Sequence, residues 1–396
     1  MPSVCLYFEV HQPFRVRRYT VFEKNHNYFN DEVNRRICLK VAHKCYLPTN
    51  QLMLELIHKH QGNFRIAYSI TGCALEQFER YAPEVLESFR ALAETGCVEF
   101  LAETYYHSLS FLYSREEFAT QVDLHRKKVR DLFGQTPQVF RNTELIYNND
   151  LAHFARQMGF RTVLCEGADH VLRGRSPDFV YRPLGCGDMK VLLKNYRLSD
   201  DIAFRFGNRN WPEWPLTTDK FASWINAING NGTNVNLFMD YETFGEHQGA
   251  QTGVFDFLRH LPEEVFRLGE DDFRTPAECV AAYPASGEYD VPHMISWADT
   301  ERDLSAWLGN AMQSNALHEL YRLEPLVLER GDPDLLEDWR RLQSSDHFYY
   351  MSTKHLADAA VHQYFNPYDS PYDAFINFMN VLDHLRGRLG AAQRSA

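Results

Sequence analysis

The sequence lacks any long hydrophobic run, and none approaches the roughly 18 apolar residues that a membrane span needs. It also lacks an excess of basic residues: 41 Lys and Arg stand against 53 Asp and Glu, which gives a formal net charge of −12. Nucleic acids and anionic membranes select basic surfaces, so neither is an expected partner. The first ten residues contain no basic segment and no cleavage site of a signal peptide, so we expect a cytoplasmic protein.

Several catalytic signatures are absent as well. The eight cysteines form no CxxC pair, and no two of the 17 histidines lie three or four residues apart, the spacing of a helical zinc site. Glycine-rich phosphate-binding loops and the GxSxG motif of serine hydrolases are missing. These absences argue against hydride transfer, phosphoryl transfer and serine hydrolysis, and the cysteines are expected to be buried thiols.

Aromatic residues, in contrast, make up 14% of the chain. Their faces suit flat, weakly charged ligands such as sugars, although a large core accounts for most of them. Trp297 and Trp307 flank an acidic stretch with Asp303, which either opens a helix facing the site or only caps that helix. The candidate sugar platforms are Trp211, Trp214, Trp297 and Trp307.

Short apolar runs alternate with helical patterns over the first 300 residues. The runs are hydrophobic throughout, as strands buried on both faces of a parallel sheet are. About seven strand–helix units favour an α/β barrel, with a doubly wound sheet as second choice. The predicted strands are residues 4–10, 64–70, 98–101, 139–142, 162–166, 191–193 and 234–240, with a further strand near 289–295. The predicted helices are residues 50–60, 75–94, 115–133, 150–158 and 219–228.

From about Asp303 the pattern changes to helices alone. Apolar residues recur at near-helical spacing, and no convincing strand separates the segments around 333–342, 353–364 and 372–389. We therefore predict a catalytic barrel over residues 1–300 and a C-terminal α-helical bundle over 301–396 that completes the active-site cleft.

Polar residues gather where the predicted strands end, which is where a barrel builds its active site. Arg141 either keeps Glu144 ionised, as a nucleophile requires, or forms a structural ion pair with it. The candidates from the first four strands are His11, Gln12, Glu99, His107, Arg141 and Glu144.

The segment 234–247 has the strongest signal: an apolar strand ends in Asp240, and Glu242 and His247 follow. Crowded carboxylates raise one another's pKa, so one stays protonated near neutrality and can act as a general acid. One protonated and one ionised carboxylate are the minimum equipment for cleaving a glycosidic bond. Asp, Glu and His also bind metals, so a metal site made by His11, Asp240 and His247 is the alternative.

These segments resemble five short motifs of glycoside hydrolase family 57, in the same order. The similarity lies in residues 11–13, 96–99, 141–144, 240–245 and 297–307. It implies an α/β fold with an incomplete (β/α)7 barrel followed by a helical bundle. It also implies a retaining mechanism, with Glu144 as nucleophile and Asp240 as general acid/base. Residues that would line the site by this resemblance are His11, Glu99, Glu242 and Asp303, with Trp297 and Trp307 nearby.

Within the family, residues 166–170, 194–201 and 239–247 resemble the α-amylases. The residues after the predicted bundle are too few for the β-rich C-terminal domain of the glucanotransferases, so by this resemblance we expect hydrolysis rather than transfer. We expect cleavage of α-1,4-glucosidic bonds in starch, glycogen or maltooligosaccharides, with no cofactor or metal. The open alternatives are 4-α-glucanotransferase or branching activity, a metal-dependent carbohydrate deacetylase or mannosidase-like enzyme, and a non-catalytic glycan-binding protein.

Overall fold

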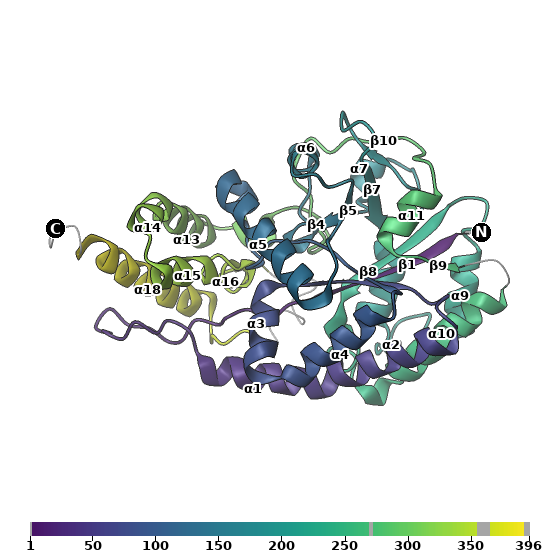
Figure 1. Ribbon diagram of the computed structural model, residues 1–396, viewed down its shortest axis with the longest axis horizontal. Helices are drawn as coiled ribbons and strands as arrows, with labels where there is room; N and C mark the ends of the chain where they lie inside the picture. The colour runs from purple at the N-terminus through teal and green to yellow at the C-terminus, as the bar shows by residue number, and fades with distance from the viewer. Residues whose placement is uncertain (1, 269–271, 355–364, 392–396) are drawn as a thin grey trace.

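The computed structural model describes residues 2–268, 272–354 and 365–391. Strands and helices alternate as far as Tyr289, and from Ser305 onward the described chain contains helices alone. Figure 1 shows the two parts side by side, with the strands around the N-terminus and the later helices toward the C-terminus. None of the described helices is long and apolar enough to cross a lipid bilayer.

The barrel strands are β1 (Ser3–Val10), β2 (Ile66–Ile70), β3 (Val98–Phe100), β4 (Val139–Arg141), β5 (Thr162–Glu166), β7 (Lys190–Lys194) and β8 (Asn234–Asp240). One parallel sheet has the order β3-β2-β1-β8 and a second has the order β4-β5-β7. A parallel bridge between Ala102 and Phe140 joins them on one side. On the other side Asn195 N donates to Asn236 O at 2.9 Å. Together the seven strands form a barrel that is incomplete in having one strand fewer than the eight of a TIM barrel.

All seven strands coincide with strands predicted from the sequence, because continuous apolar runs suit strands that are buried on both faces. The further strand expected near 289–295 is only Glu288–Tyr289 (β10), which pairs with Arg182–Pro183 (β6). A second short strand, Asp272–Phe273 (β9), pairs with the start of β1.

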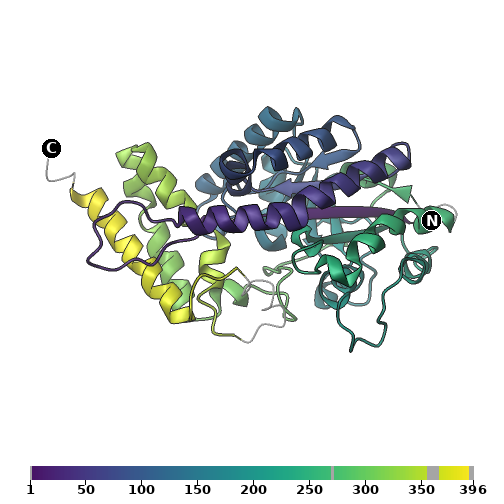
Figure 2. The same ribbon diagram turned by 90° about the horizontal axis from the view of Figure 1, so that it is seen from below.

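The helices that follow the strands are α1 (Asp31–Val41), α2 (Leu47–Lys59), α3 (Gly72–Tyr81), α4 (Pro83–Glu94), α5 (Arg115–Phe133), α6 (Asn149–Gln157), α7 (Asp169–Leu172), α8 (Tyr196–Asp200), α9 (Thr218–Asn226), α10 (Val254–Arg267) and α11 (Pro276–Ala282). The predicted helix 115–133 matches α5, which Ser114 caps at its start and Gly134 ends at a φ of 69°. The predicted helix 75–94 is two helices, because Pro83 forces Ala82 out of helical conformation. Helix α1, which the sequence pattern did not predict, continues through a π-helical turn into α2 (Figure 2).

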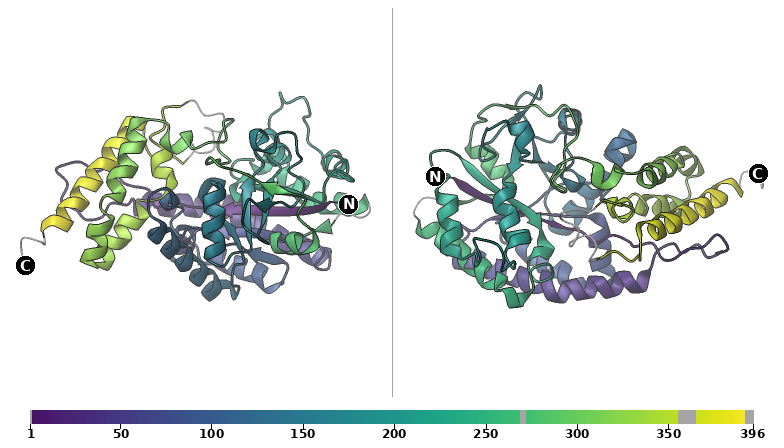
Figure 3. Two further views of the ribbon diagram at one scale, coloured as in Figure 1. Left: turned by 90° about the horizontal axis from the view of Figure 1, so that it is seen from above. Right: turned by 180° about the vertical axis from the view of Figure 1, so that it is seen from behind.

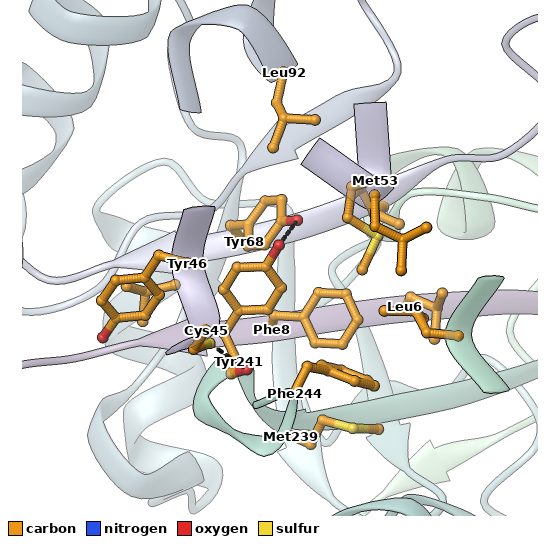
Figure 4. Packing of buried hydrophobic residues seen from close by; sticks show 14 of the residues in the cluster. Leu6, Phe8, Cys45, Tyr46, Met53, Tyr68, Leu92, Met239, Tyr241 and Phe244 are labelled. Carbon is orange, nitrogen blue, oxygen red and sulfur yellow. Dashed lines mark hydrogen bonds between the residues drawn. The ribbon is translucent and has the colours of Figure 1, made fainter. Parts of the chain in front are cut away.

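The largest core cluster lies between the first sheet and helices α2, α4 and α10. Figure 4 shows its centre, where Phe8, Tyr68 and Tyr241 pack together and the Tyr68 hydroxyl donates to that of Tyr241 at 3.1 Å. The Tyr241 hydroxyl in turn donates to Asn50 Oδ1 at 2.7 Å, so the buried hydroxyls are satisfied. All eight cysteines are free and buried, which confirms their expected role as buried thiols.

The bundle helices are α12 (Ser305–Leu308), α13 (Ala311–Tyr321), α14 (Glu324–Arg330), α15 (Pro333–Arg341), α16 (Ser345–Tyr349) and α18 (Pro371–Ala391). The bundle helices pack around a hydrophobic cluster of their own. This cluster also contains Phe14, Tyr19 and Tyr28 from the chain between β1 and α1. The segment between β1 and α1 therefore lies beside α18 of the bundle, away from the barrel strands (Figure 3). The predicted helical segment 353–364 lies almost wholly outside the described residues.

Candidate active site

A pocket opens where the C-terminal ends of the barrel strands meet the bundle. β1 contributes Glu9, β8 ends in Asp240, the turn after β4 carries Glu144, and the bundle contributes Asp346 and Tyr350. Barrel enzymes hold their active sites at this face. The residues that line the pocket are Glu9, His11, His107, Glu144, Asp240, Glu242, His247, Trp297, Asp346, Tyr350 and Phe365.

Glu144 lies in the 3-10 turn Thr143–Leu145 (η3), directly after β4. Its φ of 59° is left-handed, a conformation that costs a non-glycine residue about 1–3 kcal/mol and persists where the surroundings enforce it. Both carboxylate oxygens accept hydrogen bonds, Oε1 from Ser345 Oγ and Oε2 from Trp297 Nε1, each at 2.8 Å. The Glu144 carboxylate is therefore held in one orientation by donors that suit a negative charge.

Asp240 ends β8, and the parallel register places it beside Glu9 of β1. The Asp240 side chain is partly exposed, and within the described residues no hydrogen bond or ion pair holds its carboxylate. Glu9, in contrast, is buried and both its oxygens bind Arg141, with Nη1 to Oε1 at 2.7 Å. The Asp240 carboxylate is thus open to a ligand in the pocket, whereas Glu9 is held in a buried ion pair.

His107 lies among three carboxylates. Its Nδ1 is 3.3 Å from both Glu9 and Glu103, and its Nε2 is 3.4 Å from Glu144 Oε1. Burial alone would lower the pKa of His107, but the negative charges around it outweigh burial and raise that pKa well above its usual value. His107 therefore places a positive charge beside Glu144.

His11 connects the barrel to the bundle. Its Nδ1 lies 2.9 Å from Thr71 Oγ1, its Nε2 lies 2.8 Å from Asp346 Oδ2, and its ring stacks on that of His107 with centroids 4.1 Å apart. Burial alone would raise the pKa of Asp346, but the histidines outweigh burial and hold that pKa well below its usual range. An ionised carboxylate from the bundle thus fixes a histidine of the barrel.

Residues 5–292 match the family model described as Glycosyl hydrolase family 57. The chain belongs to glycosyl hydrolase family 57. This confirms the family that the sequence motifs indicated, together with its (β/α)7 barrel and its class of enzyme, a glycoside hydrolase.

Relatives of this family 57 chain include a protein of Methanocaldococcus jannaschii named "Putative alpha-amylase". It is 43% identical over 393 residues, which cover 95% of this chain and 82% of that protein. The protein named "Alpha-amylase 1" from Dictyoglomus thermophilum is 24% identical over 205 residues, which cover 52% of this chain and 29% of that protein.

Two solved structures share the fold. The 4-α-glucanotransferase of Thermococcus litoralis has a TM-score of 0.71 at 15% identity, over 96% of this chain and 59% of that one. The family 57 branching enzyme of Thermococcus kodakaraensis has a TM-score of 0.69 at 14% identity, over 98% of this chain and 90% of that one. At such identities the likeness concerns the fold alone.

Glu99, expected to line the site, lies outside the pocket. Its Oε2 accepts a hydrogen bond from Ala277 N (2.9 Å) at the start of α11. That helix follows β9, which pairs with the first residues of β1, so Glu99 points toward the N-terminal ends of the strands. Burial there raises the pKa of Glu99 to about 7.

Four residues proposed to contact sugar also lie elsewhere. Trp307 is fully buried in the bundle core, where helix–helix packing holds it. Asp303 accepts from Ser305 N (2.8 Å) at the start of α12, as the capping alternative predicted. Trp211 packs partly buried against the main core, and the Arg205 guanidinium lies over its ring. Trp214, half-exposed, is likewise absent from the pocket lining.

Gln12 and Arg141 do not line the pocket either, but they hold residues that do. Gln12 Nε2 donates to the Tyr46 hydroxyl (3.1 Å), which itself donates to Glu242. Arg141 forms its ion pair with Glu9 instead of the expected one with Glu144.

The sequence pattern did not predict the lining residues Glu9, Asp346, Tyr350 and Phe365, nor Ser345, which donates to Glu144. Glu9 had a usable signal, because a charged residue inside an otherwise apolar strand needs a buried partner. The four bundle residues had none, since their local pattern is that of an ordinary amphipathic helix and its flanks.

Within the described part of the chain, one cluster of side chains has the geometry to hold a metal ion. It consists of the buried residues Glu9, Glu103 and His107, whose ligand atoms lie within 4.8 Å of one another. The three ligands proposed for a metal-dependent enzyme do not form such a group. The Arg141 guanidinium already binds Glu9 and lies 3.8 Å from Glu103. A cation of the chain itself therefore compensates these carboxylates.

Glu242 lies beside Asp240 in the turn Tyr241–Thr243 (η5) and accepts a hydrogen bond from the Tyr46 hydroxyl. Burial, and then the negative charge of Asp240, raise the pKa of Glu242 to about 8. Close backbone packing fixes this turn: a Cβ on Gly245, which has a φ of 104°, would meet Lys44 O at 2.0 Å.

The raised pKa of Glu242 predicts how stability depends on pH. The folded protein binds this proton more tightly than the unfolded chain, so the contribution of Glu242 is fully present below about pH 4.5 and is lost as pH rises toward about 8. Glu242→Gln keeps an acceptor for Tyr46 and does not titrate. We expect its free energy of unfolding to exceed that of the wild type by an amount that grows from pH 5 to 8, measured by urea unfolding. A pH-independent difference would contradict this.

Proposed function

We propose that this enzyme hydrolyses α-1,4-glucosidic bonds of starch, glycogen or maltooligosaccharides with retention of configuration. The observation that carries the proposal is the pairing in one pocket of a fixed carboxylate, Glu144, with a partly exposed one, Asp240, that has no bonded partner among the described residues. Two carboxyl groups with these different environments are what glycoside cleavage requires. The relatives named as α-amylases support α-glucan as the substrate.

In the proposed reaction, Glu144 attacks the anomeric carbon while Asp240 protonates the departing glycosidic oxygen. A covalent β-glucosyl-enzyme forms, and Asp240 then removes a proton from the water that releases the sugar. Ser345 and Trp297 keep the Glu144 carboxylate aimed, and the positive charge of His107 stabilises it before attack.

We further propose that the helical bundle completes the cleft. Ser345 and Asp346 of α16 reach the site, and Ser345 N donates to His107 O at 2.9 Å, which ties the bundle to the barrel. Eight free thiols suit a reducing compartment, so we place the enzyme in the cytoplasm.

Product analysis on maltoheptaose tests the proposal. We expect only shorter chains over time, and the first products should carry the α configuration by NMR. If longer chains appeared early, the activity would be 4-α-glucan transfer instead of hydrolysis. Branched products would show that it is a branching activity. Binding without turnover would make the protein a glycan-binding protein, and activity that a chelator abolishes would favour the metal-dependent alternative.

A further inference from the structure

Trp297 is tied to Glu144 by two hydrogen bonds. Its backbone N–H donates to Glu144 O at 3.1 Å, and its indole Nε1–H donates to Glu144 Oε2 at 2.8 Å. One residue thus holds both the main chain and the carboxylate of the proposed nucleophile. The position of the Trp297 loop, residues 296–303, therefore contributes, together with Ser345, to the direction in which that carboxylate points.

Three cationic side chains contact Trp297: Arg302, Lys194 and Arg141, whose guanidinium carbon lies 4.9 Å from the centroid of the ring. Arg302 Nη1 donates to the Trp297 carbonyl, and Ser296 N donates to Arg302 O at 3.1 Å, which closes the loop. Lys194 Nζ lies 5.3 Å from the centroid of the Trp297 ring, a cation–π distance. Arg302 therefore fixes the backbone of Trp297 while Lys194 contacts its ring.

Arg302 and Lys194 are held by two acids that the proposed reaction does not use. Arg302 Nη1 lies 3.5 Å from Glu166 Oε2, and Arg302 Nη2 lies 3.4 Å from Asp200 Oδ2. Asp200 also accepts from Lys194 Nζ at 3.2 Å. Glu166 is fully buried beneath them. Buried ion pairs of this kind contribute little to stability because desolvation offsets their attraction, so stability does not explain this cluster well.

Backbone strain in the loop also indicates that its conformation is enforced by contacts. Asp299 and Arg302 have φ values of 57° and 52°, in the left-handed region that non-glycine residues rarely adopt. Such conformations persist only where the surroundings over-determine them. For Arg302 those surroundings are its contacts with Glu166, Asp200 and the Trp297 carbonyl.

We propose that Arg302 is a positioning residue, which holds Trp297 so that its indole N–H aims the Glu144 carboxylate at the substrate. This inference rests on the proposed function for its catalytic consequence. Arg302 itself is not among the residues that line the pocket, so its effect on the reaction passes through Trp297.

Kinetics give the first test. We expect Arg302→Gln to lower kcat on maltoheptaose about 10- to 100-fold with little change in KM, since a displaced catalytic group slows the chemical step. The acidic limb of the pH profile should move to higher pH, because Glu144 loses a donor to its charged form. Arg302→Lys should restore part of kcat. The control is Glu117→Gln, which breaks an equally buried pair with Arg340 and does not line the pocket.

A double-mutant cycle tests whether Arg302 acts through Trp297. If it does, Arg302→Gln costs little in a Trp297→Phe background, and the two losses are not additive. Fully additive losses, or an Arg302→Gln variant no slower than the control, would overturn the inference.

A spectroscopic test needs no turnover. The six tryptophans give six indole N–H signals in ¹⁵N-labelled protein, and Trp297→Phe identifies the signal of Trp297. We expect Arg302→Gln to shift that signal and Glu117→Gln to leave it in place. An unmoved signal overturns the inference whatever the activity. A shifted signal in a protein that does not cleave maltoheptaose would refute the proposed function and leave the positioning intact.

Discussion

Glu144→Gln is expected to reduce kcat on maltooligosaccharides by about 10⁴-fold or more, the scale on which loss of a nucleophile acts in other covalent mechanisms. The amide keeps the shape of the carboxylate and can still accept from Trp297 or Ser345, so the pocket should hold its form. What it lacks is the negative charge that forms the bond to the anomeric carbon. KM should change much less than kcat.

Glu117→Gln provides the matched control, since it makes the same change at a buried glutamate that binds Arg340 and Gln121 and does not line the pocket. It should retain wild-type kcat. If Glu144→Gln kept most of the activity, Glu144 would not be the nucleophile.

A variant with a smaller side chain at position 144 gains a reaction instead of losing one. Glu144→Ala leaves space on the side of the sugar from which Glu144 attacks, and azide can enter it. With a 4-nitrophenyl α-glucoside, azide forms the bond to the anomeric carbon as nitrophenolate departs, so the product is a β-glucosyl azide. An α-glucosyl azide, or no rescue, would contradict attack from the Glu144 side.

Asp240→Asn is expected to lower kcat by about 10²–10⁴-fold, because the amide can neither protonate the departing oxygen nor remove a proton from water. Asp240 is suited to both steps: it ends β8 at the pocket, and its carboxylate has no bonded partner among the described residues. The measurement is kcat on maltoheptaose, with Glu117→Gln as control.

The leaving group separates this role from a merely structural one. Nitrophenolate departs without protonation, so formation of the glucosyl-enzyme from 4-nitrophenyl substrates should be far less impaired in Asp240→Asn than that from maltoheptaose. A burst of nitrophenolate followed by slow turnover is the expected signature. An equal loss on both substrates would assign Asp240 a role other than acid catalysis.

The sequence by itself determined the strands and the two carboxylates at their ends. Continuous apolar runs indicated the seven buried parallel strands, and a parallel barrel gathers the C-terminal ends of all its strands. Because Glu144 and Asp240 directly follow such runs, their meeting in one pocket required no knowledge of long-range contacts.

Only the tertiary structure decided the partners of these carboxylates. Arg141 binds Glu9 instead of Glu144 because strand register and the depth of each side chain in the barrel set which groups meet. Glu99 faces α11 for the same reason. Contacts across the fold, such as Ser345 with Glu144, leave no periodic trace in the local sequence, since they depend on how the bundle docks on the barrel. The local sequence placed the two carboxylates of the proposed reaction, and long-range packing set their partners and orientation.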